Sequence, residues 1–325
     1  MIRNLLARHL LAFAAIVLSG AFAVAQDGYP NRLIKIIVPF PAGTAADTIP
    51  RMVMDKLSQR WGQPIIIENR PGATGNIGAE MAARAEPDGY TLLASAPPPL
   101  AINQSLYSNL TYDASAFLPI SLMAVIPNVL VVHPSVPANT LQQLVELTKT
   151  KPDELNYGST GPGGTPQLTM ELFKLETGAK LRDIPYRRGI APAIIDLLAG
   201  RVQTMAVNIS DALPHIRSGS LRALAVTVDK RIPQLPDVPA VAESLPGFYS
   251  ATWYAMMAPP RTPAEIADKL SSAVNEILHS TEISEKLREQ SMIVAGTSPK
   301  ETENFIQAEI ARWRGVITKA GIKPD

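Results

Sequence analysis

Short apolar runs alternate with amphipathic segments along most of the chain, and this alternation constrains the fold more than any other feature. The runs LIKIIV (33–38), QPIIIEN (63–69) and YTLLASA (90–96) predict strands, with helical patterns between them. Further strands are expected at 128–134, 153–159, 182–187, 201–208 and 221–227, and helices at 140–149, 165–178 and 191–200. Strands that are apolar throughout and alternate with helices predict an α/β fold with parallel sheets covered on both faces.

Two apolar segments bounded by prolines, 119–128 and 248–260, are expected to connect two lobes. A chain that crosses twice builds one lobe from its two ends and the other from its middle. We therefore predict that residues 26–125 and 250–325 form lobe 1 and that residues 126–249 form lobe 2. The chain has 325 residues, 46% of them apolar, which is long enough for two such lobes.

The first 25 residues have the pattern of a secretion signal. Arg3 and Arg8 make the start positive, LLAFAAIVL (10–18) is apolar, and Ala23-Val24-Ala25 has the small-x-small form of a cleavage site. The apolar run is shorter than the roughly 20 residues that span a bilayer. A cleaved signal peptide over 1–25 predicts an exported protein of the bacterial periplasm.

Composition excludes several classes of protein. The chain has no cysteine, which excludes disulfides, thiol catalysis and lipid attachment at an N-terminal cysteine. Its 30 Lys and Arg residues are balanced by 29 Asp and Glu residues without basic blocks, which argues against a nucleic-acid partner. No His pair or His–carboxylate cluster has metal-ligand spacing, so we expect neither a metal nor a cofactor.

The stretch VPFPAGTAAD (38–47) runs from a strand into a helix and could hold an anion. Gly43 allows close approach to the backbone, and the small residues around it leave amide N–H groups uncovered. Asp47 is expected to cap the following helix. Free amides and the positive end of a helix dipole favour an anion, although a purely structural turn is the alternative.

A second stretch, NYGSTGPGGTPQL (156–168), has the same construction, with Thr165 as the expected cap. If the chain crosses as predicted, this loop belongs to the other lobe, and both loops can face one cleft. Phosphate is not the expected anion, because neither loop contains the Gly-Lys of a Walker motif. The glycines of RPGATGNIGAE (70–80) are spaced GxxGxxG, so this run does not predict a dinucleotide site either.

The chain closely resembles the substrate-binding proteins of tripartite tricarboxylate transporters, the Bug-type periplasmic receptors. The resemblance covers essentially the whole mature chain, and the segments that carry it are YPNRLIKIIVPF, PAGTAAD, IIENRPGATGNIGAE, EPDGYTLL, LNYGSTGPGGTPQL, PAIIDLLAGRVQ, ALPHIRSGSLRALAVT, ATWYAMMAPPRTPAEI and AEIARW. It implies a type II periplasmic-binding-protein fold, in which two α/β lobes close on a ligand carboxylate held by the two loops. It also implies an integral membrane permease as the partner and a receptor that works as a monomer without catalysis.

The resemblance also implies which residues contact the ligand. The first loop supplies Ala42, Gly43, Thr44 and Asp47; the second supplies Ser159, Thr160, Gly161, Gly164 and Thr165; Ser95, Ala96 and Asn208 are expected at the cleft edge, with Phe40 in its wall.

Four departures from the family pattern affect the expected ligand. The stretch PYRRGIAPA (185–193) is one residue longer than the usual pattern, which leaves the roles of Arg187 and Arg188 open. Thr44 stands where a second glycine is usual, and Val207 stands where many relatives have an acid. Pro97, Pro98, Pro99 and Leu100, with Phe40, make the expected cleft wall apolar. We therefore predict a carboxylate without an amino group and with an apolar or aromatic body, such as a terephthalate- or benzoate-like acid, with an aliphatic dicarboxylate as the alternative.

Two other functions are compatible with the same loops. A hydrolase or lyase could use them as an oxyanion hole, with Ser159 as nucleophile and His215, expected in a Pro-rich connection, as base. A receptor could also signal through a sensor protein instead of delivering its ligand to a transporter.

Overall fold

The computed structural model describes residues 28–152, 154–187 and 189–324. The chain divides into two compact units, Met1–Asn31 and Arg32–Asp325. The predicted signal peptide, residues 1–25, lies outside the described residues. In the described ranges, no helix has the length and apolar character needed to cross a membrane.

All described strands and helices belong to the second unit. The strands are β1 (Ile34–Val38), β2 (Ile65–Asn69), β3 (Thr91–Ser95), β4 (Leu118–Val132), β5 (Asn156–Ser159), β6 (Arg182–Pro185), β7 (Thr204–Asn208), β8 (Arg222–Val226), β9 (Ala251–Ala258) and β10 (Ile293–Val294). The helices are α2 (Ala45–Trp61), α3 (Asn76–Ala83), α4 (Asn103–Leu106), α5 (Leu141–Thr150), α6 (Thr165–Thr177), α7 (Ile190–Leu198), α8 (Ile209–Arg217), α9 (Ala264–Leu278), α10 (Thr281–Glu289) and α11 (Pro299–Ala320), with short 3-10 or π turns at Ala73–Gly75, Pro98–Ile102, Ala114–Ala116 and Val241–Glu243.

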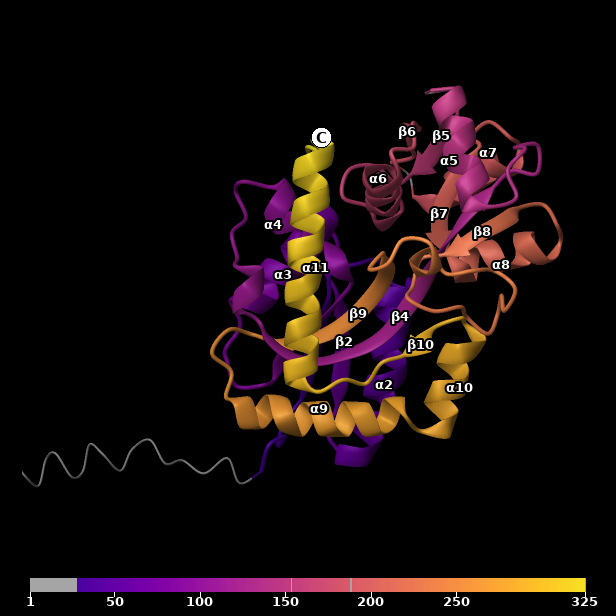
Figure 1. Cartoon of the computed structure of the whole chain (residues 1–325). Coiled ribbons are helices and arrows are strands. Elements are labelled where there is room, and N and C mark those ends of the chain that lie inside the picture. Colours follow the sequence, from indigo (N-terminus) through magenta and orange to yellow (C-terminus); the bar gives the residue numbers. More distant parts are fainter. Residues whose placement is uncertain (1–27, 153, 188, 325) are drawn as a thin grey trace, which may run out of the picture. The chain divides into compact units, whose positions relative to one another are not determined.

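The strands form two groups that share β4 (Figure 1). The first group has the order β2-β1-β3-β9-β4, with β10 also paired to β4. The second group has the order β4-β7-β5-β6, with β8 also paired to β4. Helices α9 and α11 pack on β4 in the first group, while α6, α7 and α8 pack on strands of the second. Each group is therefore the centre of its own α/β layer structure.

Strand β4 passes from one group to the other without a break. Residues Leu118–Pro127 pair with β9, and residues Asn128–Val132 pair with β7 and β8. The predicted connection at 119–128 and the predicted strand at 128–134 therefore belong to one strand. The sequence pattern had separated them because Pro127 and Asn128 are typical of strand ends. The predicted lobe boundaries near residues 125 and 250 stay predictions.

The prediction of wholly parallel sheets was wrong. Strands β1, β2 and β3 are parallel, as are β5, β6 and β7, but β4 and β9 run antiparallel to their neighbours. The apolar pattern misled because β4, buried in all but its first residue, is as continuously apolar as a parallel strand. Burial on both faces, and not strand direction, produces that pattern.

A buried carboxylate holds the C-terminal helix to the first group of strands. Glu309 of α11 is fully buried and accepts hydrogen bonds from the indole nitrogens of Trp253 at 2.8 Å and Trp313 at 2.9 Å. The guanidinium of Arg312 forms an ion pair with the same carboxylate. Because both indoles are themselves almost fully buried, Glu309 is the common acceptor for three donors in the core.

Candidate functional site

The first glycine loop connects β1 to α2 and is fixed by a side chain from the first helical turn. Gly43 has φ 82°, and its N–H donates to Oδ2 of Asp47 at 2.9 Å. The residue before the helix is Thr44, whose hydroxyl donates to the carbonyl of Pro41 at 2.8 Å. The prediction that Asp47 caps the helix was wrong in detail, because Asp47 is the third helical residue and reaches back to Gly43.

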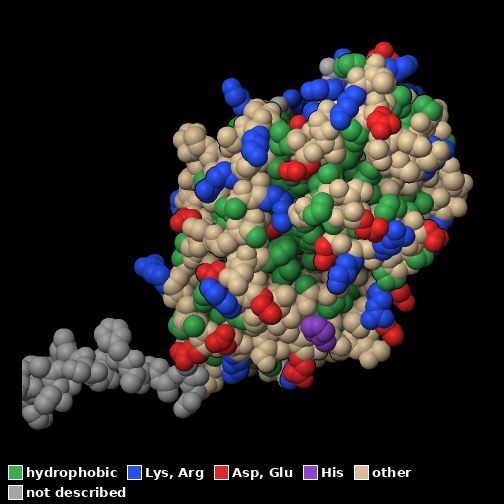
Figure 2. All heavy atoms as spheres, viewed as in Figure 1, with side chains coloured by type: hydrophobic (Ala, Val, Ile, Leu, Met, Phe, Trp, Pro, Cys, Tyr) green, Lys and Arg blue, Asp and Glu red, His purple; other side chains and the backbone are tan. Residues whose placement is uncertain are grey.

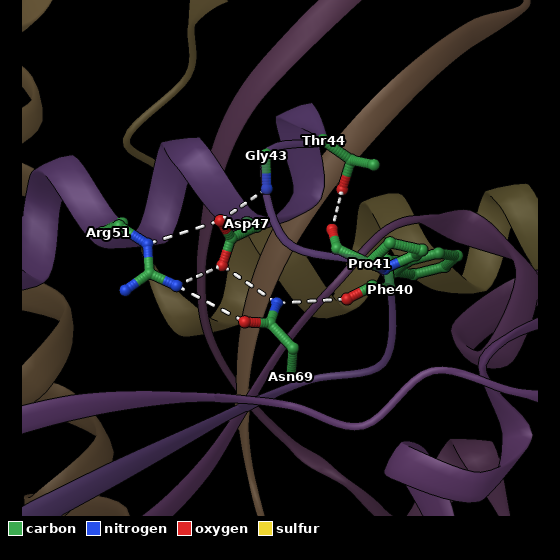
Figure 3. A network of polar contacts seen from close by, with 7 residues as sticks. All are labelled: Phe40, Pro41, Gly43, Thr44, Asp47, Arg51 and Asn69. Atoms are coloured by element: carbon green, nitrogen blue, oxygen red, sulfur yellow. Dashed lines mark hydrogen bonds and ion pairs between the residues drawn. The ribbon is translucent and has the colours of Figure 1, made fainter.

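Asp47 is the centre of a network that joins the loop, the helix and the neighbouring strand (Figure 3). Its Oδ1 accepts from Nη2 of Arg51 at 2.6 Å and from Nδ2 of Asn69 at 2.9 Å, and Asn69 also donates to the carbonyl of Phe40 at 3.1 Å. Burial acts to raise the pKa of Asp47, but the hydrogen bonds from Arg51, Gly43 and Asn69 outweigh it and lower that pKa. The loop is thus held by an ionised carboxylate whose charge Arg51 balances.

The second glycine loop connects β5 to α6 and is built in the same way. Gly163 has φ 78°, and its N–H donates to Oε1 of Gln167 at 3.1 Å. Gln167 in turn donates to Oδ2 of Asp183 at 2.8 Å. The predicted cap at Thr165 was wrong, because the residue before the helix is Gly164 and Thr165 is the first residue inside it.

The two loops therefore share one device. In each, a glycine with positive φ donates its N–H to the polar side chain four residues later, in the first turn of the helix. This bond leaves other amides available: in the described part of the chain, the N–H groups of Ala45, Ala46 and Thr165 have no acceptor. Amides of this kind at the positive ends of helices are suited to hold an anion.

The loops line two adjoining cavities. The larger, of about 840 Å³, is lined by Gly43, Thr44, Ala45 and Thr48 of the first loop and helix. The smaller, of about 220 Å³, is lined by Thr160, Thr165 and Pro166 of the second. Both are also lined by Ile190, Asn208 and Asp211, so the N-terminal ends of α2 and α6 lie at two cavities that share these three residues. The larger volume is in the range of small-molecule sites.

Five of the thirteen predicted ligand-binding residues line these cavities: Gly43, Thr44, Thr160, Thr165 and Asn208. Asn208 precedes α8 and accepts a hydrogen bond from the hydroxyl of Thr252 at 2.9 Å. The other eight, Phe40, Ala42, Asp47, Ser95, Ala96, Ser159, Gly161 and Gly164, do not line either cavity. Among these, Asp47 and Ser159 support the loops, since Ser159 accepts the N–H of Gly161 at 3.1 Å.

None of the residues predicted to form an apolar wall lines these two cavities. Leu100 is fully buried, and Pro99 and Phe40 both lie against Gly75. The larger cavity instead receives apolar side chains from β4, α7, α8, β9 and the segment after α10, and these residues are Ile126, Ile190, Leu213, Pro214, Tyr254 and Met292. They come from distant parts of the sequence, which is why no local pattern identified them.

An acid also lies in this space, although the sequence pattern suggested that none would. Val207 is 1% exposed and sits inside β7, opposite Val129, while Asp211 lies in the first turn of α8 and lines both cavities. The signal that could have found Asp211 is its place in the first turn of a helix that follows a strand.

Ser159 and His215, the nucleophile and base of the alternative enzymatic function, do not form a catalytic pair. The side chain of Ser159 is fully buried, and His215 lies inside α8, not in a connection. In the described residues, no hydrogen bond joins the two side chains. Pro214 suggested a connection at this point, but α8 includes it.

Two α/β groups joined by a shared strand, with a helix N-terminus from each at adjoining cavities, define a two-lobed solute-binding protein. Residues 49–322 match the tripartite tricarboxylate transporter family receptor, TctC. The chain therefore belongs to this family of substrate-binding receptors. This membership confirms the resemblance and the prediction that the protein is a receptor and not an enzyme. The solved structures that it resembles confirm the two-lobed α/β fold of periplasmic binding proteins.

One relative and two solved structures each match nearly the whole chain. Protein BugT of Bordetella pertussis is 39% identical over 306 residues, which cover 93% of this chain and 94% of BugT. The structure of R. palustris Rpa4515 with adipate is 37% identical, has a TM-score of 0.77 and covers 91% of this chain and 100% of its own. MatC (Rpa3494) from Rhodopseudomonas palustris with bound malate is 30% identical, with a TM-score of 0.73 and coverage of 89% and 100%.

Proposed function

We propose that this receptor captures an organic carboxylate in the periplasm and delivers it to an integral membrane permease of the tripartite tricarboxylate type. The observation that carries the proposal is the pair of helix N-termini, with the free amides of Ala45, Ala46 and Thr165, at two cavities that share Ile190, Asn208 and Asp211. Such amides suit a carboxylate, whose two oxygens each accept hydrogen bonds. Membership in the TctC family supports the transport role.

The ligand that we propose has an apolar body. The support for it is the set of apolar side chains in the larger cavity, including Ile126, Ile190 and Leu213. Two kinds of body are candidates: a benzoate- or terephthalate-like ring, and a chain like that of adipate, which the structure of Rpa4515 holds.

A thermal-shift screen of carboxylates tests the proposed function. A ligand at about 100 times its Kd stabilises the folded state by about 2.7 kcal/mol. Since about 1 kcal/mol moves Tm by about 2–4 °C in domains of 150–250 residues, we expect a rise of several degrees. Benzoate, terephthalate, adipate, malate, citrate and aspartate should be compared side by side. If none of them raises Tm, the chain is not a receptor for this class of acid; if only citrate or aspartate does, the apolar body is wrong.

Ligand binding is expected to close the cleft. We propose that residues 26–125 with 250–325 move toward residues 126–249, because one anion held by helices from both groups draws them together. Small-angle X-ray scattering should then give a smaller radius of gyration at saturating ligand than without it. An unchanged scattering curve, measured where calorimetry proves saturation, would contradict closure.

A further inference from the structure

Asp211 lines both cavities, and its side chain is partly buried. In the described part of the chain, its carboxylate makes neither a hydrogen bond nor an ion pair. Its neighbour in the preceding turn, Asn208, is by contrast bonded to Thr252. Burial raises the pKa of Asp211, as expected for an acid that loses water without gaining a partner.

The described charged and titratable groups that line the larger cavity form no ion pair with Asp211. Those that line the larger cavity are Arg217 from the same helix, Tyr254 from β9 and Glu289 at the end of α10. Arg217 lies six residues along α8, and residues at that spacing are not neighbours on a helix surface. Tyr254 is buried, which raises its pKa, and the charge of Asp211 raises it further, so this phenol stays neutral. Glu289 has the same sign of charge as Asp211.

An unpaired carboxylate in a binding cleft must find a donor when the ligand displaces water. Burying it without one is costly, because a buried acceptor loses its hydration and gains nothing in return. Under the proposed function, the free amides of the two loops bind the carboxylate of the ligand. A hydrogen-bond donor on the body of the ligand would then give Asp211 the partner that it otherwise lacks.

We propose that Asp211 determines specificity by selecting carboxylates that carry a hydrogen-bond donor, a hydroxyl or an ammonium group, on their body. This inference rests on the proposed function. It adds a second polar group to the proposed ligand, beside its carboxylate. It reverses the expectation drawn from Val207: the acid that would pair with such a group comes from the first turn of α8, four residues further on. Acids without a donor leave Asp211 unpaired and bind more weakly.

Two matched series of acids test this inference by isothermal titration calorimetry. The aliphatic series shares one four-carbon skeleton: succinate has no donor on its body, malate has a hydroxyl, and aspartate has an ammonium group. The aromatic series consists of benzoate, 4-hydroxybenzoate and 4-(aminomethyl)benzoate. In the wild type, the donor-bearing acids should bind more tightly than the parent acid. In Asp211→Asn their Kd should rise about 10- to 100-fold, as for a lost hydrogen bond to a charged group, while the parent acid binds equally or better.

The ligand-free proteins provide a readout that separates selection from a structural role. Since Asp211 has no hydrogen-bond or ion-pair partner among the described residues, Asp211→Asn should have a Tm equal to or above that of the wild type, whereas loss of a structural carboxylate would lower it. Asp268→Asn, at an exposed position of α9, is the control that should change neither Tm nor any Kd.

Four outcomes overturn the inference. Equal losses for succinate and malate in Asp211→Asn would mean that Asp211 does not discriminate donors, and a clear fall in Tm would mean that it supports the fold. If donor-bearing and parent acids bind the wild type equally, the selection is absent while the receptor function stands. If no acid in either series or in the thermal screen binds, the proposed function fails as well.

Discussion

Replacing Glu309 by alanine is expected to lower the free energy of unfolding by about 3–5 kcal/mol, the usual cost of removing one partner of a buried ion pair. The variant leaves the indole N–H groups of Trp253 and Trp313 without their acceptor and the guanidinium of Arg312 without its counter-charge. Urea unfolding followed by tryptophan fluorescence measures the change, with an unaltered m-value as the sign that the unfolded state is the same.

Two further variants make this expectation specific. Glu309→Gln keeps the volume and one oxygen acceptor but removes the charge, so its loss should be smaller than that of the alanine variant. Glu303→Ala lies on the same helix, where its side chain is 47% exposed and pairs with Lys300, and it should change stability by less than about 0.5 kcal/mol. A loss below about 1 kcal/mol for Glu309→Ala would mean that the three donors find other acceptors.

The Gly43→Val variant is expected to raise the Kd for a bound carboxylate at least about tenfold. A β-branched residue is strongly disfavoured at the φ of 82° that Gly43 adopts, so the loop must shift and carry the free amide of Ala45 with it. One hydrogen bond to a charged group is worth about 1.5–3 kcal/mol, and about 1.4 kcal/mol is a factor of ten in Kd. Gly161→Val makes the same test at the second loop, where φ is 91°.

The same helix offers a matched control for this variant. Gly62 follows the other end of α2, has φ 64°, and like Gly43 has open space where a side chain would extend. Gly62→Val should therefore carry a comparable loss of stability, visible in Tm, with the Kd unchanged. If the Kd in Gly43→Val also stays at the wild-type value, the anion does not rest on the first loop.

Local patterns in the sequence predicted most of the elements and both glycine loops. Strand β5, helix α6 and strand β7 fall where the apolar periodicity placed them, because each pattern reports the burial of its own residues. The loops were predictable for a similar reason, since glycines between a strand and a helix describe a local backbone geometry.

Features that depend on partners far away in the chain were not predictable in this way. Asn69 completes the network around Asp47 only because β2 pairs in parallel with β1, which sets Asn69 beside Val38 at the start of the loop. Asp211 enters the cleft because α8 follows β7 directly, and Leu100 leaves the expected wall because the turn at Pro98–Ile102 buries it. Pairing and packing decide these positions, and no window of neighbouring residues contains that information.

The unbroken course of β4 restricts how receptors of this kind exchange parts. To exchange one lobe between two relatives, the chain would be cut near residue 125, where the sequence predicts the boundary between the lobes. That cut falls inside β4, shortly before the point between Pro127 and Asn128 at which the partner of the strand changes from β9 to β7 and β8. A chimera joined there inherits half of its central strand from each parent, so recombination that preserves folding has its natural joints outside Leu118–Val132.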